Sequence, residues 1–167
     1  MPEVNSAWKG IESVLGDLLT RFEVPRHDCL EFGVEHGYST AAFASFFENV
    51  TGVDTFTGDI HTNVFGDFYA ATTQRLSVFP NVKLIRGDYR DWIASDSKRY
   101  DLIHVDIVHT YVDTYACGLW AAMHSRCTLF HDTESFPAVK QALIDISRNT
   151  GKRVYNYREH YGLGILV

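Results

Sequence analysis

One short stretch constrains the fold of this chain more than any other part of it. Residues 29–40 read Cys-Leu-Glu-Phe-Gly-Val-Glu-His-Gly-Tyr-Ser-Thr, an apolar run that carries the acid Glu31 and is followed by two glycines with three residues between them. Ser39 and Thr40 then begin a helix. A strand, a tight loop and a helix N-terminus in this order are typical of α/β folds that bind a nucleoside-bearing cofactor.

The rest of the chain repeats the alternation of strand and helix. Apolar runs predict five strands, and segments with helical spacing of apolar residues lie between them. The strand-like runs cover residues 28–34, 50–54, 82–85, 101–106 and 127–130, and residues 153–157 and 161–167 add two consecutive strands. This order predicts an α/β fold of the Rossmann-like, doubly wound type, with a mostly parallel seven-stranded sheet and one antiparallel strand near the C-terminus.

The length of the chain suits one domain. A chain of 167 residues can bury one full hydrophobic core, so we expect a single domain over residues 1–167. Apolar residues from Trp8 to Phe22 recur at helical spacing, Asn5 or Ser6 can cap their start, and Pro25 follows. Residues 1–24 are therefore expected to form an N-terminal helix that packs on the core.

Composition narrows the class of partner. The formal net charge is −6 and the 15 basic residues are scattered, which disfavours a nucleic-acid partner. No apolar run is long enough to span a bilayer, and the N-terminus lacks the pattern of a signal peptide, so no membrane partner is expected. Cys29, Cys117 and Cys127 show no paired spacing, and Cys29 and Cys127 lie in predicted strands, where a cysteine is usually a small core residue; this favours the reducing cytoplasm.

Carboxylates mark the ends of all five predicted parallel strands. They are Glu31, Asp54, Asp88, Asp106 and Asp132. A single acid in such a place is more often a helix cap or a loop residue, but capping does not readily explain five in a row. Because functional groups of doubly wound folds gather at the carboxyl ends of the strands, these acids predict the position of a site.

The first loop favours one kind of cofactor over another. Its glycine spacing differs from the G-x-G-x-x-G pattern of dinucleotide sites. Glu31 and Glu35 flank the loop and would repel a pyrophosphate, whereas a zwitterionic cofactor with a cationic amino group suits them. Asp54 follows Glu31 by 23 residues, close to the spacing at which an acid reaches ribose hydroxyls.

On these residues the chain resembles class I S-adenosylmethionine (SAM)-dependent methyltransferases. The segment from Glu31 to Thr40 is similar to their first motif, Asp54 to their ribose-binding acid, and Gly87-Asp88 to the motif near the adenine. Residues 53–61, 103–111 and 129–133 look like the small-molecule O-methyltransferases that include sugar and macrolide-sugar enzymes. The resemblance implies SAM as the cofactor, bound by Glu31, Gly33, Glu35, Gly37, Ser39, Asp54, Thr55, Asp88, Tyr89 and Asp106.

Some relatives in this group hold a divalent metal through acids that follow the fourth and fifth strands. The matching residues are Asp106 and Asp132. This chain departs from the pattern at Ile107, where the family has Gly, and at Thr133, where catechol-type relatives have an acid or Asn. It also lacks the Pro-Gly-Gly turn before the fifth strand. The resemblance thus implies a metal site with one ligand unaccounted for. Two carboxylates suit Mg²⁺ and a histidine ligand favours a transition metal, and the sequence does not choose.

Methyl transfer to a hydroxyl requires an aligned attack and a deprotonated oxygen. His109 is the first candidate base, since it follows Asp106 by three residues and histidine titrates near neutral pH. Asp106 is the second candidate catalytic residue. His131 and His61 are competitors for the base, and the alternative for His109 is to orient the following helix. His104, inside a strand, is expected to be a core residue.

Together these features predict a SAM-dependent O-methyltransferase acting on a hydroxyl of a small, sugar-like molecule, with a metal such as Mg²⁺ as an optional aid. Two alternatives stay open: a non-catalytic SAM-binding protein, and another SAM-using enzyme such as one that cleaves SAM. Residues 57–66 are the segment available as a substrate lid. Because little of the chain lies outside the core, a homodimer in which a partner subunit completes the pocket also stays open.

Overall fold

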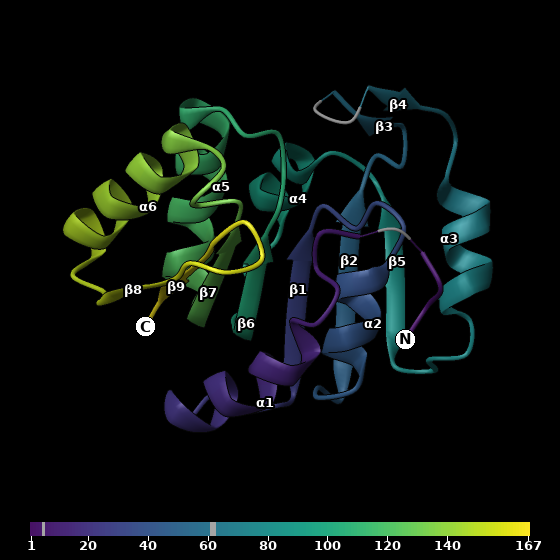
Figure 1. Ribbon diagram of the computed structural model, residues 1–167, viewed down its shortest axis with the longest axis horizontal. Coiled ribbons are helices and arrows are strands. Elements are labelled where there is room, and N and C mark those ends of the chain that lie inside the picture. Colours follow the sequence, from purple (N-terminus) through teal and green to yellow (C-terminus); the bar gives the residue numbers. More distant parts are fainter. Residues whose placement is uncertain (5, 61–62) are drawn as a thin grey trace.

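The computed structural model describes residues 1–4, 6–60 and 63–167. Its central element is a sheet with the strand order β5-β2-β1-β6-β7-β9-β8 (Figure 1). The strands of this sheet are β1 (Asp28–Phe32), β2 (Asn49–Asp54), β5 (Val82–Arg86), β6 (Tyr100–Val105), β7 (Ser125–His131), β8 (Val154–Tyr157) and β9 (Leu163–Leu166).

Strand directions confirm the fold class predicted from the sequence. Five strands of this sheet (β1, β2, β5, β6 and β7) are parallel to their neighbours in that set, while β9 runs antiparallel to both β7 and β8. Phe32 of β1 lies beside Val53 of β2 and Val105 of β6. The three strands therefore end at the same level, and the loops that follow them meet at one edge of the sheet.

Helices cover both faces of this sheet. One apolar cluster joins α1 and α2 to Cys29, Leu102 and Leu129, and the other joins α4, α5 and α6 to the residues next to these in each strand. Neighbouring residues of a strand point to opposite faces, so strands covered on both sides read as nearly continuous apolar runs. The helices are α1 (Glu12–Arg21), α2 (Tyr38–Ala44), α3 (Tyr69–Leu76), α4 (Tyr89–Ser95), α5 (Tyr111–His124) and α6 (Pro137–Thr150).

The N-terminal helix packs on the core but begins later than the sequence pattern indicates. Gly10 has φ +96°, a left-handed conformation that no right-handed helix contains, and α1 starts after it, at Glu12. Trp8 and Ile11 are nevertheless buried. The Ser6 hydroxyl accepts the N–H of Trp8 instead of capping a helix, and Asn5 lies outside the described residues.

The segment between β2 and α3 contains more structure than the expected loop. Two short strands, β3 (Gly58–Asp59) and β4 (Val64–Phe65), pair antiparallel at the top of the molecule (Figure 1). Residues 61 and 62, including the candidate base His61, lie outside the described residues. All three cysteines are buried and free, as expected for Cys29 and Cys127. Among the helices of the described ranges, none has both the length and the apolar character to cross a membrane.

Candidate active site

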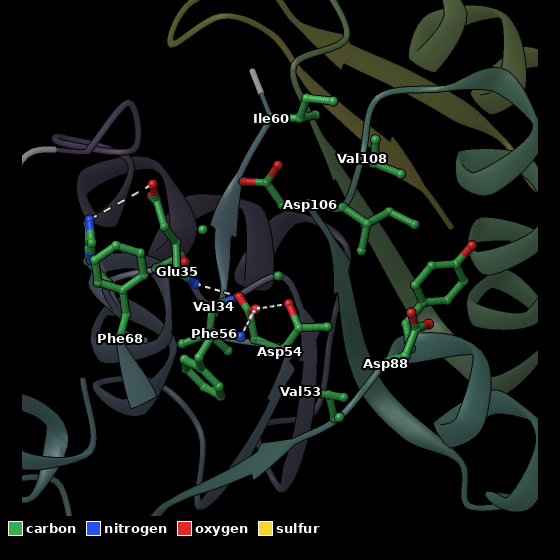
Figure 2. A pocket seen from close by; sticks show the side chains of 18 of the residues that line it. Val34, Glu35, Val53, Asp54, Phe56, Ile60, Phe68, Asp88, Asp106 and Val108 are labelled. Atoms are coloured by element: carbon green, nitrogen blue, oxygen red, sulfur yellow. Dashed lines mark hydrogen bonds and ion pairs between the residues drawn. The ribbon is translucent and has the colours of Figure 1, made fainter. Parts of the chain in front are cut away.

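A cavity of about 360 Å³ opens at the carboxyl ends of β1, β2, β5 and β6 (Figure 2). Its size lies within the range of small-molecule sites, and its place is where doubly wound folds bind ligands. Most of the candidate residues from the sequence line it. These are Gly33, Glu35, Ser39, Asp54, Thr55, Asp88, Tyr89, Asp106 and His109.

The glycines of the first loop allow close approaches. Gly33 has φ +89°, and a Cβ atom there would lie 1.7 Å from the carbonyl oxygen of Asp106. Gly37 has φ +82°, and a Cβ there would meet Leu76 of α3 at 2.7 Å. Gly37 immediately precedes α2 but does not line the cavity. The two glycines therefore bring the loop against β6 on one side and α3 on the other.

Asp54 holds this loop in shape. One carboxylate oxygen accepts the N–H groups of Val34 at 2.8 Å and of Glu35 at 2.7 Å, and the other accepts the N–H of Phe56 at 2.7 Å (Figure 2). Carboxylates bound by backbone N–H groups are strong and oriented acceptors. Asp54 thus ties the loops after β1 and β2 together at the floor of the cavity. Its predicted contact with ribose stays a prediction.

Glu31 lies elsewhere than the sequence indicates. Its side chain is 0% exposed and faces the layer between the sheet and α2, not the cavity. The carboxylate accepts the Thr40 hydroxyl at 2.5 Å and lies 3.0 Å from Nδ1 of His104, which is also fully buried. The cause is strand alternation, because Glu31 points to the same face as Cys29. As expected, His104 is a core residue.

Asp88 and Tyr89 lie on the opposite wall, where β5 leads into α4. The Asp88 carboxylate caps α4 by accepting the N–H of Arg90 at 2.8 Å, and it pairs with the Arg90 guanidinium at 3.0 Å. The Tyr89 hydroxyl donates to Asp113 at 2.8 Å, and burial together with that carboxylate holds the pKa of Tyr89 above its usual range. Both residues are thereby fixed beside the cavity.

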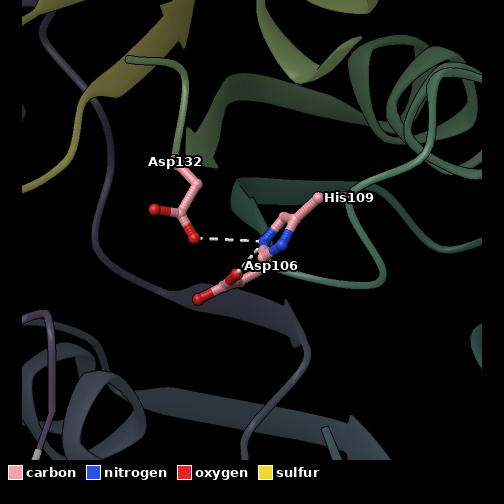
Figure 3. Close-up of side chains that lie close together, drawn as sticks. All are labelled: Asp106, His109 and Asp132. Carbon is pink, nitrogen blue, oxygen red and sulfur yellow. Dashed lines mark hydrogen bonds and ion pairs between the residues drawn. The ribbon is translucent and has the colours of Figure 1, made fainter. Parts of the chain in front are cut away.

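Four side chains gather where β6 and β7 end; we call Asp106, His109, His131 and Asp132 the strand-end cluster. Nε2 of His109 lies 3.3 Å from Asp106 Oδ1 and 3.1 Å from Asp132 Oδ2 (Figure 3). Nδ1 of His131 lies 3.2 Å from Asp106 Oδ2 and 3.4 Å from Asp132 Oδ2. The His109 ring is stacked on Phe136 with centroids 4.2 Å apart. Each imidazole therefore faces both carboxylates.

The charges of the strand-end cluster are coupled. Burial disfavours protonated rings, but the two carboxylates outweigh it and raise the pKa of His109 to about 9 and that of His131 to about 10. Burial alone would favour neutral acids, yet the protonated rings hold the pKa of Asp106 well below its usual range and that of Asp132 at about 2. A general base must be neutral before it accepts a proton. Near neutral pH the carboxylates therefore favour the protonated form of His109, and a second cation beside them would favour the neutral ring.

Sequence reasoning missed the contribution of the N-terminal segment. Ser6 and Trp8 line the cavity. The centroid of the Trp8 ring lies 4.5 Å from that of His104 and 5.1 Å from that of His131. Gly10 was the signal in the sequence that could have predicted this position, since it separates Trp8 from the residues with helical spacing. Tyr38, Phe56 and Phe65 also line the cavity, while Trp92 of α4 packs against the apolar cluster on the side of α5 and α6.

Comparison with known proteins places this site within a family. A family model described as a methyltransferase domain matches residues 30–133, which is more than half of the chain. The chain belongs to this family. The match spans the loop after β1 and the acids after β2, β5, β6 and β7, and it confirms the resemblance found in the sequence. No curated protein matches the chain.

Solved structures share the fold of this methyltransferase domain. The O-methyltransferase from Bacillus cereus in complex with SAH is 14% identical, with a TM-score of 0.66 over 99% of this chain and 82% of that one. SAM-bound CalS10, an amino pentose methyltransferase from Micromonospora echinaspora, is 12% identical, with a TM-score of 0.72 over 97% and 92%. Apo CalS11, a TDP-rhamnose 3′-O-methyltransferase, is 20% identical, with a TM-score of 0.67 over 93% and 79%.

Proposed function

We propose that this methyltransferase domain transfers a methyl group from SAM to a hydroxyl of a small molecule. One observation carries the proposal: a single cavity joins the loop held by Asp54 to Asp106 and His109 of the strand-end cluster. The first part suits a methyl donor and the second suits an acceptor hydroxyl. The alternatives of a non-catalytic SAM-binding protein and of a SAM-cleaving enzyme are outcomes of the experiment below.

The charges along the cavity support SAM as the donor. Glu35, Asp54 and Asp88 contribute carboxylates to its walls, which attract an amino group and a sulfonium but repel the pyrophosphate of a dinucleotide. Two proteins of the same fold were solved with SAM or SAH bound. We propose that Gly33, Ser39, Thr55 and Tyr89 complete the donor site, and that Glu31 and Gly37 support it from behind the wall.

The strand-end cluster supports the acceptor side. A sulfonium methyl is already activated, so the protein mainly has to align the attacking oxygen and favour its deprotonated form. His109 lines the cavity and is proposed as the base, with Asp106 orienting its ring. Asp106 and Asp132 would hold a divalent cation, whose charge favours a deprotonated hydroxyl when it is bound.

We also propose that the acceptor is a sugar-like molecule. It rests on the sequence motifs and on the sugar substrates named for CalS10 and CalS11. We further propose that residues 1–167 act as one domain in the cytoplasm, with the N-terminal segment over the cavity, and that a homodimer could extend the acceptor wall. A cavity of about 360 Å³ supports a small molecule, not a polymer, as the acceptor.

Calorimetry and product formation test the function together. SAM should bind with one-to-one stoichiometry and more tightly than NAD, and methyl transfer to a panel of small alcohols should fall about 10²–10⁴-fold in His109→Ala, the usual contribution of a general base. SAM binding should remain in this variant. The matched control is His27→Ala, since His27 is exposed and pairs with Glu48 far from the cavity.

Other outcomes have defined meanings. Tighter binding of NAD than of SAM overturns the donor assignment. SAM binding without transfer to any acceptor points to the non-catalytic alternative, and loss of SAM without a methylated product points to cleavage. Equal transfer by the wild type, His109→Ala and Asp106→Ala removes the strand-end cluster from the chemistry.

A further inference from the structure

The hairpin of β3 and β4 carries three large apolar side chains that are exposed. Ile60, Val64 and Phe65 are 67%, 50% and 64% exposed. Exposed apolar side chains that gather in one place mark binding surfaces more often than scattered ones do. Ile60 and Phe65 line the cavity and Val64 does not, since neighbouring residues of a strand point to opposite faces. One face of the hairpin therefore belongs to the wall of the cavity.

The backbone holds this hairpin in place. The N–H of Gly66 donates to the carbonyl oxygen of Thr57 at 3.0 Å, just outside the two paired strands. Gly58 has φ +97°, and a Cβ atom there would lie 2.0 Å from the carbonyl oxygen of Val64. The two strands therefore approach more closely than any other residue at position 58 would allow. Phe65, which pairs with Gly58, is exposed on a formed hairpin.

The segment after β6 adds apolar side chains to the same cavity. Ile107 and Val108 follow Asp106 directly, and all three residues line the cavity. In the view of Figure 2, Ile60 and Val108 lie toward the end of the cavity where Asp106 lies. The proposed acceptor hydroxyl lies beside Asp106. The part of the acceptor next to that hydroxyl would therefore meet apolar side chains.

The charges of the cavity do not suit an anionic acceptor. Among the described residues that line it, Arg90 is the only Arg or Lys, and its guanidinium pairs with Asp88 at 3.0 Å and with Asp113. Burial lowers the pKa of His36, which favours its neutral ring. The ring of His109 is already shared by the two carboxylates of the strand-end cluster. A phosphate on the acceptor would thus lack a cation that is not already paired, so a neutral acceptor is favoured.

We propose that the β3–β4 hairpin selects the acceptor, and that Ile60 and Phe65 favour a neutral molecule with a ring-sized apolar group beside the hydroxyl. The proposal rests on the proposed function and deepens it. A sugar-like acceptor would then be a glycoside with an apolar substituent, not a free sugar or a nucleoside diphosphate sugar. Contact between that substituent and the hairpin removes apolar surface of both partners from water.

Calorimetry on the full-length protein saturated with SAH measures acceptor binding without turnover. The probes are matched phenyl and methyl glycosides of several common sugars, which share their hydroxyls and differ in the apolar group. At least one phenyl glycoside should bind about 10–100-fold more tightly than its methyl partner, the effect expected from burying an apolar group of this size. TDP-glucose, a nucleoside diphosphate sugar, should bind no more tightly than the methyl glycoside.

Variants of the hairpin assign the preference to its residues. Phe65→Ala should reduce the preference for the phenyl glycoside about 10-fold and leave binding of the methyl glycoside unchanged, because the ring contacts only the apolar group. Ile60→Ala should reduce the preference less. Val64→Ala is the matched control, since Val64 is exposed on the same strand but does not line the cavity, and it should retain the preference.

Each other outcome has a defined meaning. A preference unchanged in both Phe65→Ala and Ile60→Ala, or lost equally in Val64→Ala, overturns the role of the hairpin. Failure of every phenyl glycoside to bind more tightly than its methyl partner, or tightest binding of TDP-glucose, overturns the acceptor class. SAH titration of the same samples separates the two proposals. A protein that does not bind SAH contradicts the proposed function, whereas SAH binding without the phenyl preference contradicts the hairpin proposal alone.

Discussion

Two carboxylate–imidazole clusters lie along β6, only two residues apart, and they differ in almost everything except composition. The inner cluster joins Glu31 to His104 and Thr40, with every side chain fully buried between the sheet and α2. The strand-end cluster joins Asp106 and Asp132 to His109 and His131 at the edge of the cavity. Both contain the residue types of an acid–base site.

The difference shows that the position of a carboxylate–imidazole cluster, not its residue types, decides whether the cluster is closed inside the core or accessible to a ligand. In the inner cluster, each Glu31 oxygen has one donor, and Trp8 and Phe43 pack against the His104 ring. No ligand can reach it. In the strand-end cluster, each ring is shared by two carboxylates, and Asp106 and His109 reach the cavity. Coupled carboxylates and imidazoles beside an open space are the groups that can exchange a proton with a bound molecule.

The largest effect on stability should come from the inner cluster. Glu31→Ala leaves His104 and Thr40 with unpaired buried groups, and we expect a loss of about 3–5 kcal/mol in the free energy of unfolding, as for other broken buried pairs. Urea denaturation measures it. The control is Glu48→Ala, an exposed acid whose loss should stay within about 0.5 kcal/mol. Similar values for the two variants would contradict the structural role of Glu31.

A single methyl group added at Gly33 should disturb the strand-end cluster through the backbone of Asp106. Gly33→Ala places a Cβ 1.7 Å from the Asp106 carbonyl oxygen at φ +89°, so the loss should reach about 3 kcal/mol, the upper end of common overpacking costs, and SAM binding should weaken. Gly87→Ala is the control, since it also lines the cavity but has no atom within 4 Å of the added Cβ. Equal stability of both variants would show that the β1 loop and β6 can separate without cost.

Alkali should weaken the strand-end cluster in the metal-free protein. The folded-state pKa values of His109 and His131, about 9 and about 10, lie above the usual 6.5, so their stabilisation is complete below pH 6.5 and is lost as pH rises through 9–10. We expect a decrease of about 1.5–3 kcal/mol, the contribution of a hydrogen bond to a charged group. Denaturation curves between pH 6 and pH 10 measure it. Asp132→Asn should make this decrease in stability with pH smaller. An unchanged dependence of stability on pH in this variant would show that Asp132 does not contribute to it.

Much of this arrangement could be predicted from the sequence because periodicity and strand ends are local signals. Apolar runs that stop at Asp54, Asp88, Asp106 and Asp132 locate the edge of the sheet at which the cavity forms. The glycine spacing after β1 indicates a close approach, and the structure supplies the neighbour at Gly33. The mostly parallel sheet with an antiparallel strand near the C-terminus follows from the alternation and the final pair of strands, whereas the order of the strands comes from the structure.

The rest depends on contacts between distant segments. Glu31 has the sequence position of a cofactor contact, but it faces α2, because a residue one place earlier or later in a strand points to the opposite side. Trp8 approaches the cavity only because Gly10 turns the chain before α1. The orientation of the His131 ring depends on a carbonyl 29 residues later, which no local pattern encodes.

The contact between His131 and the carbonyl of His160 also bears on the order in which parts of the site form during protein synthesis. A growing polypeptide that has left the ribosome only as far as Asp132 already holds every side chain of both clusters. Residue 160 and β9, which pairs with residues 128–131 of β7, are still to come. The half of the cavity around β1 and β2 can form while synthesis continues. The half at the end of β7 must wait for the final hairpin, so newly made protein should acquire the proposed methyl-donor site before the proposed acceptor site.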